Sequence, residues 1–351
     1  MSGAFILGPD LSLFEEEVGE WLGSSHAIAV SSGTSALWLS LKAAGVGPGD
    51  KVLTSPFTFF ATVSAIMNVG AQPVFCDILP STFNMDPNAA EAILRRDTSR
   101  KIKAIIPVHL YGQAADLESI VSLADKYHLS LIEDAAQAIG AEVKDKKAAT
   151  WGHFGCLSFF PTKNLGGLGD GGLVTTQDGA LAEKIRVLRV HGAKTKYYHD
   201  VIGDNCRMDT MQAAILRVFL PQLKEWIQQR QSAAKFYDRH LRDISTLIDI
   251  PSRVGYGNHT FHQYTLRVKD NLRDSLKEYL DDKGIGATVY YPVPCHLQKA
   301  LAPFGFQKGD FPHAELAALE VLSLPVFPGI TEEELTTVSS AINGFLALGR
   351  G

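Results

Sequence analysis

The sequence lacks the features that mark secreted, membrane-spanning and metal-binding proteins. Its four cysteines lie far apart and form no CxxC pair, so their spacing predicts neither a disulfide framework nor a zinc site. No apolar run reaches the roughly 18–20 residues that span a bilayer. The first residues, "MSGAFILGPDLS", lack the basic and long apolar segments of a signal peptide. We therefore expect a reduced, cytoplasmic protein without a bound metal ion.

An excess of positive charge is also missing. The formal net charge is −5, which disfavours binding to nucleic acid or to an anionic membrane. Hydrophobic residues make up 46% and charged residues 20% of the chain, as is ordinary for a globular protein. The length of 351 residues is sufficient for two domains.

Short, β-rich apolar segments alternate with amphipathic ones between residues 27 and 176. The β-rich segments are "HAIAVSSG", "DKVLTSP", "QPVFCDI", "KAIIPVHLYG", "LSLIEDAAQ", "GCLSFFP" and "GGLVTT". The amphipathic segments lie near 34–45, 57–69, 87–95 and 116–128. This βαβ alternation predicts an α/β fold: a large domain with a mostly parallel seven-stranded sheet flanked by helices.

The rest of the chain predicts a connector and a smaller domain. Residues 208–242 have helical spacing, and Pro221 either kinks this helix or starts a new one. An α+β domain follows, with strands near 261–268 and 285–291 and helices near 271–283, 311–323 and 331–347. We place the large domain at residues 1–235 and the small domain at residues 236–351.

Two motifs follow predicted strands, where ligands of open α/β sheets bind. In "SSGTSAL", Gly33, Thr34 and Ser35 would offer backbone N–H groups and a hydroxyl to an anion, or simply cap a helix. In "LIEDAAQAIG", Asp134 is either another helix cap or a charge that holds the protonated ring nitrogen of a heterocyclic cofactor.

A third motif, "SFFPTKNLGGLGDGG", places Lys163 between a strand end and a glycine-rich turn. A lone lysine is usually a solvated charge, but a buried one has a lowered pKa that suits Schiff-base chemistry. The glycine run resembles a dinucleotide fingerprint, yet a β-like "LVTT" follows it instead of a helix. A nicotinamide-dependent dehydrogenase is therefore the weakest of the hypotheses for the function of this protein.

Taken together, the motifs resemble the DegT-type family of sugar aminotransferases, pyridoxal-phosphate enzymes of aspartate-aminotransferase fold type I. The resemblance rests on eight motifs in order: "SSGTSAL", "SPFTFFAT", "IPVHLYG", "EDAAQAIG", "SFFPTKNLGGLGDGG", "RVHGAKTKYYH", "IGDNCRMDTMQAAIL" and "YPVPCHLQ". It covers nearly the whole chain. Family members usually carry an extra segment before the "FILGP"-like residues, so we expect a shorter substrate-side wall or a trimmed start.

The resemblance implies a role for each matching residue around pyridoxal 5′-phosphate. Lys163 would form the internal aldimine and shuttle the proton, and Asp134 would pair with the pyridinium nitrogen. Gln137 would approach the ring hydroxyl, and Phe59 would stack on the ring or be an ordinary core aromatic. Dehydratase relatives carry histidine in place of this lysine, so Lys163 favours transamination.

The resemblance also implies how the phosphate is held. Gly33, Thr34, Ser35 and Ser158 would bind it within the subunit. Asn205, in "GDNCRM", would reach the phosphate of the partner subunit's cofactor, or be only a turn residue. The implied assembly is a homodimer with shared active sites.

The implied reaction moves an amino group from L-glutamate to a nucleotide-linked keto sugar in amino-sugar biosynthesis, with lipopolysaccharide as one destination. Candidate substrate-binding residues are Lys196, Tyr197, His262, Tyr290 and His296, each of which could instead be structural. "SFFPTKNLG" favours carbon 3 of a UDP-linked 3-keto hexose, either N-acetylated or a uronate. The alternatives are a dTDP-linked 3-keto-6-deoxyhexose, a 4-keto sugar, or a non-catalytic regulatory protein of the same fold.

Overall fold

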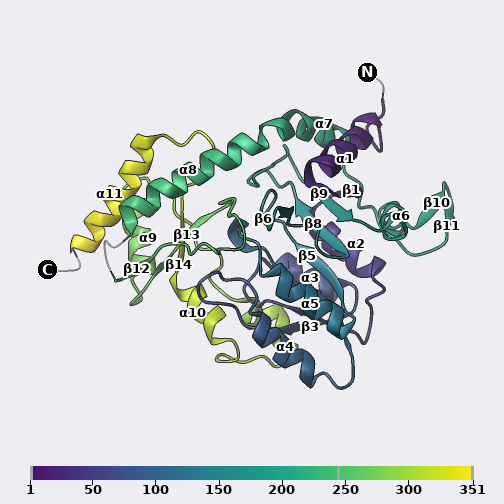
Figure 1. The fold of residues 1–351 in the computed structure, drawn as a ribbon, viewed down its shortest axis with the longest axis horizontal. Coiled ribbons are helices and arrows are strands. Elements are labelled where there is room, and N and C mark those ends of the chain that lie inside the picture. Colours follow the sequence, from purple (N-terminus) through teal and green to yellow (C-terminus); the bar gives the residue numbers. More distant parts are fainter. Residues whose placement is uncertain (1–2, 243–245, 349–351) are drawn as a thin grey trace.

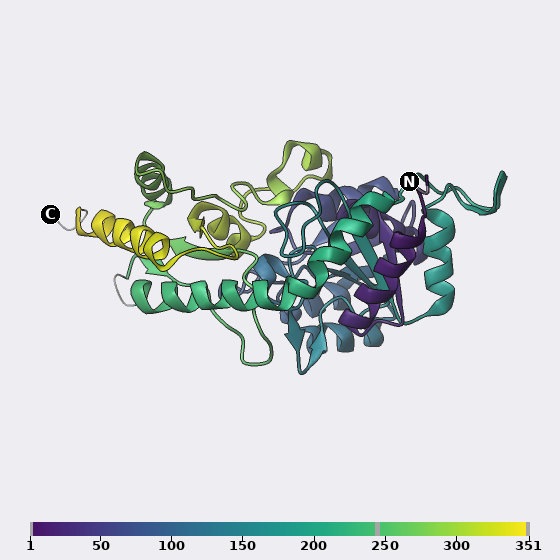
Figure 2. The ribbon, with the colours of Figure 1, turned by 90° about the horizontal axis from the view of Figure 1, so that it is seen from above.

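The computed structural model describes residues 3–242 and 246–348. It contains a large sheet with its covering helices and a smaller sheet with helices of its own (Figure 1). Helix α8 (Leu223–Leu241) extends from one group to the other, as both views show (Figure 2). Within the described ranges, no helix has the length and apolar character needed to cross a membrane.

The large sheet has seven strands in the order β1-β9-β8-β5-β4-β2-β3. Strand β9 runs antiparallel to both of its neighbours, and the remaining pairs are parallel. The strands are β1 (His26–Val30), β2 (Lys51–Thr54), β3 (Gln72–Phe75), β4 (Ile102–Ile106), β5 (Ser130–Asp134), β8 (Phe154–Ser158) and β9 (Gly172–Thr176). They coincide with the seven β-rich segments of the sequence, so the predicted fold class is confirmed.

Helices cover both faces of this sheet because its strands are apolar on both sides. In β1, Ile28 and Val30 pack with residues of α2 and α6, whereas Ala27 and Ala29 pack with residues of α1 and α7. The helices are α1 (Pro9–Leu22), α2 (Gly33–Ala43), α3 (Phe60–Asn68), α4 (Pro87–Arg96), α5 (Leu117–Tyr127), α6 (Gly179–Leu188) and α7 (Thr210–Phe219). The amphipathic segments expected from the sequence do not include α1 or α6, so these two helices were not predicted.

Pro221 separates two helices. It lies in the 3₁₀ turn η2 (Leu220–Gln222), between the end of α7 and the start of α8. This confirms that a new helix starts near the proline, which cannot donate a helical hydrogen bond. The predicted domain boundary after residue 235 falls inside α8 and stays a prediction.

The smaller sheet is antiparallel, with β13 (Tyr264–Val268) between β12 (Ile248–Asp249) and β14 (Val321–Leu324). Its helices are α9 (Arg273–Asp282), α10 (Pro312–Glu320) and α11 (Glu332–Leu348). The remaining short elements are β6 (Glu142–Val143), β7 (Lys146–Lys147), β10 (Ala193–Thr195), β11 (Tyr198–His199), η1 (Leu110–Gly112), η3 (Cys295–Leu297) and η4 (Lys299–Phe304). The β10–β11 hairpin projects from the body in both views (Figures 1 and 2).

Two expectations for this region are wrong. Residues 285–291 form no strand, because the segment pairs with β14 only at Thr288 and Ser323 and then carries Tyr291 to the rings of Phe57 and Phe59. The helix expected over 311–323 ends at Glu320, since the next residues form β14 beside β13.

Candidate active site

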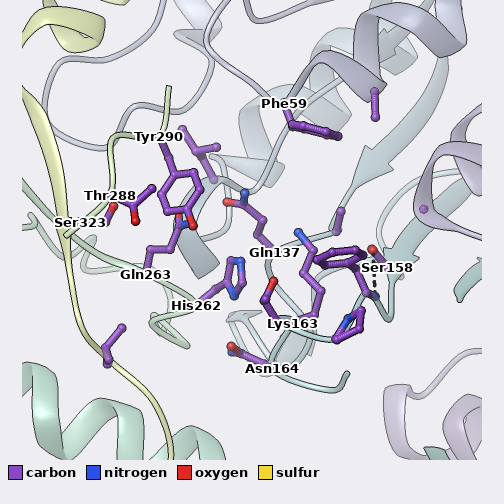
Figure 3. A pocket seen from close by; sticks show the side chains of 18 of the residues that line it. Phe59, Gln137, Ser158, Lys163, Asn164, His262, Gln263, Thr288, Tyr290 and Ser323 are labelled. Atoms are coloured by element: carbon purple, nitrogen blue, oxygen red, sulfur yellow. Dashed lines mark hydrogen bonds between the residues drawn. The ribbon is translucent and has the colours of Figure 1, made fainter. Parts of the chain in front are cut away.

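A cavity of about 1170 Å³ opens where the carboxyl ends of β1, β5 and β8 meet loops of the smaller sheet. The large sheet contributes Ser32, Asp134 and Ser158, and the smaller sheet and its loops contribute Thr288 and Ser323. Figure 3 shows side chains from both groups around this space. Because open α/β sheets bind ligands at this edge, we take the cavity as the candidate active site.

Lys163 lies near the middle of the cavity, between Gln137 and Ser158 (Figure 3). A turn sets its position: its backbone N–H donates to the carbonyl of Phe160 at 2.8 Å, just beyond β8. Burial lowers the pKa of its ammonium from 10.5 to about 8, against the opposing effect of the Asp134 carboxylate. A larger fraction of Lys163 is therefore neutral near pH 8 than for a solvated lysine, as a nucleophilic amine requires.

Asp134 ends β5 on the cavity wall. Its Oδ2 accepts a hydrogen bond from Thr62 Oγ1 at 2.7 Å, and its Oδ1 accepts one from the backbone N–H of Ala136 at 3.2 Å. Burial raises the pKa of this carboxyl, although both hydrogen bonds and the charge of Lys163 lower it. The carboxylate would thus gain from a further cation in the cavity.

The adjacent acid, Glu133, serves the fold instead. It is fully buried and accepts hydrogen bonds from three backbone N–H groups at 2.7–2.8 Å and from His109 Nε2 at 3.0 Å. His109 Nδ1 accepts from the backbone N–H of Ala115, which makes Nε2 the protonated nitrogen. Neighbouring residues of a strand point to opposite faces, so one acid is structural and Asp134 is left to the cavity.

Gln137 is held at both ends of its amide. Its Oε1 accepts from the backbone N–H of Tyr111 at 2.7 Å, and its Nε2 donates to the hydroxyl of Tyr291 at 3.0 Å. The hydroxyl of Tyr111 in turn donates to the carbonyl of Tyr290, on the loop that crosses from the smaller sheet. These bonds fix the amide in the cavity wall beside Lys163 (Figure 3).

An anion site lies where α2 begins. Ser32 caps the helix by accepting from the N–H of Ser35, and the first-turn N–H groups of Gly33 and Thr34 have no intrahelical acceptor. A Cβ on Gly33 would lie 2.8 Å from Ser158 Cβ, so only glycine lets α2 approach the end of β8 this closely. A Cβ on Gly172 would lie 2.3 Å from the Ser32 carbonyl, so the close approach of β9 to this helix start also requires glycine.

The structure brings most of the predicted residues to one place. Those that line the cavity are Gly33, Thr34, Phe59, Asp134, Gln137, Ser158, Lys163, His262 and Tyr290. Phe59 is the residue just before α3, and it is 60% exposed, so a flat ligand can pack on its ring. Ser35 lies just behind the wall, where its hydroxyl contacts Ser31 at 2.7 Å and Ser32 at 3.0 Å.

Four predicted residues lie outside this cavity. His296 is buried, with its Nε2 3.1 Å from Glu315 Oε1 and its ring against Phe311, so its side chain does not reach the cavity. Lys196, Tyr197 and Asn205 lie on or near the β10–β11 hairpin and are exposed.

Sequence reasoning missed several residues that line the cavity or that orient the residues lining it. Thr62 and Tyr291 orient Asp134 and Gln137, and both fall inside motifs whose other positions drew the assignment. Arg230 and Asn164 line the cavity with buried side-chain atoms that lack hydrogen-bond partners. Arg230 carries no local signal, because it lies mid-helix between Gln229 and Gln231 and is buried only by long-range packing.

These residues fit pyridoxal phosphate. The helix start suits a phosphate, the amine of Lys163 suits an aldehyde, and the buried carboxylate of Asp134 suits a protonated ring nitrogen. An exposed aromatic ring, Phe59, completes the wall.

Comparison with known proteins gives an independent result. The DegT/DnrJ/EryC1/StrS aminotransferase family matches residues 1–343. A "pleiotropic regulatory protein" of Geobacillus stearothermophilus is 49% identical over 98% of this chain and 91% of its own length. A UDP-N-acetyl-3-dehydro-alpha-D-glucosamine 3-aminotransferase of Acidithiobacillus ferrooxidans is 43% identical over 97% and 89%. Further relatives, 38% and 39% identical, are named as dTDP-amino-sugar transaminases.

A solved structure agrees with these sequences. NtdA of Bacillus subtilis, with bound cofactor PMP, superposes with a TM-score of 0.91 at 32% identity, over 99% of this chain and 79% of that one. The chain belongs to the DegT/DnrJ/EryC1/StrS aminotransferase family. It is a sugar aminotransferase that uses pyridoxal phosphate, so the predicted family, enzyme class and cofactor are confirmed.

Proposed function

We propose that this member of the DegT/DnrJ/EryC1/StrS family transfers the amino group of L-glutamate to carbon 3 of a UDP-linked 3-keto hexose, either N-acetylated or a uronate. The observation that carries the proposal is that Lys163, with its pKa of about 8, and the buried Asp134 line the same cavity. The Acidithiobacillus relative, named for a UDP-linked 3-keto sugar, supports the acceptor.

Each residue would act on the cofactor at a defined atom. Bound pyridoxal phosphate supplies an electron sink that stabilises negative charge at the substrate carbon. Asp134 would keep the ring nitrogen protonated, and Thr62 would hold the carboxylate in line with it. The Nζ of Lys163 would carry the proton to and from the reacting carbon, because it is the amine at the cavity centre (Figure 3).

The remaining groups would bind and orient. The N–H groups of Gly33 and Thr34, together with Ser158, would hold the phosphate, and Gln137 would contact the ring hydroxyl. Phe59 would pack on the ring face and exclude water from it.

The far side of the cavity would bind the sugar nucleotide. The volume of about 1170 Å³ exceeds the roughly 300–1,000 Å³ of a typical small-ligand pocket, so it has room for more than the cofactor. Tyr290 and His262 from the smaller-sheet side are the candidate sugar contacts, together with the hydroxyls of Thr288 and Ser323.

A homodimer would complete the site. Lys196, Tyr197 and Asn205 do not line their own chain's cavity but are exposed, and Tyr197 and Ile202 are 80% and 85% exposed. Exposed apolar side chains of this size favour a protein interface. In a dimer, Asn205 would reach the phosphate site of the partner subunit.

Other acceptors and one other role remain as alternatives. A dTDP-linked 3-keto-6-deoxyhexose is favoured by the relatives named for such sugars, and a 4-keto sugar is the next candidate. A purely regulatory role is raised by the name of the Geobacillus relative. It would not require the combination of Lys163, Asp134 and Gln137 in one cavity.

The experiment is an amination assay with L-glutamate and a panel of UDP- and dTDP-linked 3-keto and 4-keto sugars. We expect turnover with a UDP-linked 3-keto sugar and none with Lys163→Ala. Turnover confined to dTDP-linked or 4-keto sugars would replace the proposed acceptor. Unchanged turnover in Lys163→Ala would overturn the mechanism.

A further inference from the structure

The glycine-rich loop that follows Lys163 is not explained by the chemistry of the cavity. This loop, residues 164–171, has four glycines in eight residues. Asn164 and Asp170 line the cavity at its two ends, but the glycines between them do not. Gly167 and Gly169 also lack the left-handed φ that usually calls for glycine. A close neighbour must therefore account for these two positions.

That neighbour is Gln212 of helix α7, which does not itself line the cavity. A Cβ on Gly167 would lie 2.8 Å from Gln212 Oε1, and a Cβ on Gly169 would lie 2.7 Å from Gln212 Nε2. A side chain at either position would push the amide away, because both distances are shorter than real Cβ contacts. The two glycines thus let one side-chain amide lie directly against the loop.

The amide also forms a hydrogen bond to the loop. Gln212 Oε1 accepts from the backbone N–H of Leu168 at 3.0 Å. Leu168 lies between the two glycines and is 72% exposed, so burial of its side chain contributes little to the position of the loop. The middle of the glycine-rich loop is therefore held to α7 through the side chain of Gln212.

Backbone hydrogen bonds connect this loop to the segment that carries Lys163. The N–H of Gly167 donates to the carbonyl of Phe159 at 2.8 Å, and the N–H of Phe159 donates to the carbonyl of Gly171 at 2.8 Å. The N–H of Lys163 donates to the carbonyl of Phe160, also at 2.8 Å. Lys163 thus belongs to the same compact turn, at its cavity side (Figure 3). The position of the loop and the position of Lys163 are coupled.

We propose that Gln212 is a positioning residue, which holds the glycine-rich loop against α7 and thereby keeps Lys163 where its amine meets the cofactor. The inference rests on the proposed role of Lys163. Without the bond from Gln212, the loop takes other positions for part of the time. The fraction of molecules whose amine is placed for attack falls accordingly, and cofactor capture slows by that fraction.

The test measures how fast cofactor-free protein takes up pyridoxal phosphate. Absorbance is followed about one pH unit above the lowered pKa of Lys163, so that most of the amine is neutral and the rate reports its placement. Gln212→Met keeps the length of the side chain but removes the acceptor, whereas Gln212→Glu keeps an oxygen that can accept from Leu168.

The matched control is Gln177→Met. Gln177 Oε1 also accepts a backbone N–H at 3.0 Å, that of Ser25. Ser25 lies just before β1, whereas the cavity opens at the other end of that strand. The control therefore removes an equivalent hydrogen bond far from Lys163.

Gln212→Met should take up the cofactor roughly 3- to 10-fold more slowly, as the loss of one such hydrogen bond implies. Gln212→Glu and Gln177→Met should stay within about twofold of the unsubstituted protein. An unchanged rate in folded Gln212→Met would overturn the proposal. An equal loss in Gln212→Glu or Gln177→Met would also overturn it, because the effect would then not follow the acceptor at position 212.

Loss of folding in Gln212→Met does not end the test. Site-resolved hydrogen exchange on the unsubstituted protein should then show the Leu168 N–H exchanging about tenfold or more slowly than in an unstructured peptide, although the residue is largely exposed. Exchange as fast as in such a peptide would contradict the role of Gln212. Failure of the proposed function is a separate result: Lys163→Ala takes up the cofactor with the same absorbance change, while the Leu168 N–H stays protected.

Discussion

Thr62 Oγ1 donates a 2.7 Å hydrogen bond to Asp134 Oδ2 and so ties helix α3 to the end of strand β5 at the cavity wall. Thr58 lies one turn earlier, with its hydroxyl 2.8 Å from that of Thr62. The acid on which the proposed chemistry depends is thus oriented by a side chain that does not itself line the cavity.

Substitutions at Asp134 and Thr62 separate the effect of the Asp134 charge from the effect of its orientation. Asp134→Asn should lower kcat/KM by 100-fold or more, because a neutral amide cannot stabilise a protonated ring nitrogen. Thr62→Val should cost roughly 10-fold, the lower end of what a hydrogen bond to a charged group contributes, because the backbone N–H of Ala136 still holds the carboxylate. Steady-state kinetics with thermal melting as the folding control distinguishes the two, and equal losses would contradict the assigned roles.

The pKa of Lys163 predicts a pH dependence for cofactor capture. The neutral amine attacks the aldehyde, so the rate at which cofactor-free protein takes up pyridoxal phosphate should rise with pH and level off above about 8. A solvated lysine would instead continue to gain rate toward its usual pKa of 10.5. Stopped-flow absorbance across pH 6–10, about two units to either side of the lowered pKa, measures the profile. A midpoint near 10 would show that burial does not perturb Lys163.

His296 should prove structural. Its ring lies against Phe75 and Phe311, and its Nε2 hydrogen-bonds to Glu315. His296→Ala should destabilise the protein by about 2–4 kcal/mol, because it leaves a cavity and removes one of the hydrogen-bond partners of Glu315. The KM for the sugar nucleotide should change less than twofold. A large KM change with unchanged unfolding free energy would restore this residue to the substrate site.

The proposed sharing of active sites between two subunits predicts complementation. Lys163→Ala and Asn205→Ala should each be nearly inactive alone, but a refolded mixture should regain part of the activity. In a mixed dimer, one site would combine the intact Lys163 of one subunit with the intact Asn205 of the other. Light scattering gives the assembly size. A mixture as inactive as its components would place Asn205 outside the partner's site.

The sequence predicts the large sheet well because each of its strands can be recognised from a short local segment. Segments such as His26–Val30 and Gly172–Thr176 are short, apolar and bounded by turn residues, and all seven form strands. Helix α1 was not predicted, although Leu11, Phe14, Val18 and Leu22 recur at helical spacing on its buried side.

What escaped prediction depends on contacts between distant segments. Residues 285–291 have strand composition, but β14 offers them only one paired position. His296 stands in a family motif, yet packing against α10 turns it away from the cavity. The local sequence predicts Arg230 as a surface charge. In the fold it is buried, because its Nη1 donates to the backbone carbonyls of Phe261 and Val326. Burial of this kind is a property of the assembled fold, not of the local pattern.

The most direct test of the account is the visible absorption spectrum of the purified protein with pyridoxal phosphate, before and after addition of L-glutamate. The account predicts a yellow protein whose band is lost on adding glutamate, while Lys163→Ala shows no such band. A protein that stays colourless with added cofactor, or a band in Lys163→Ala equal to that of the unsubstituted chain, would contradict the central role of Lys163.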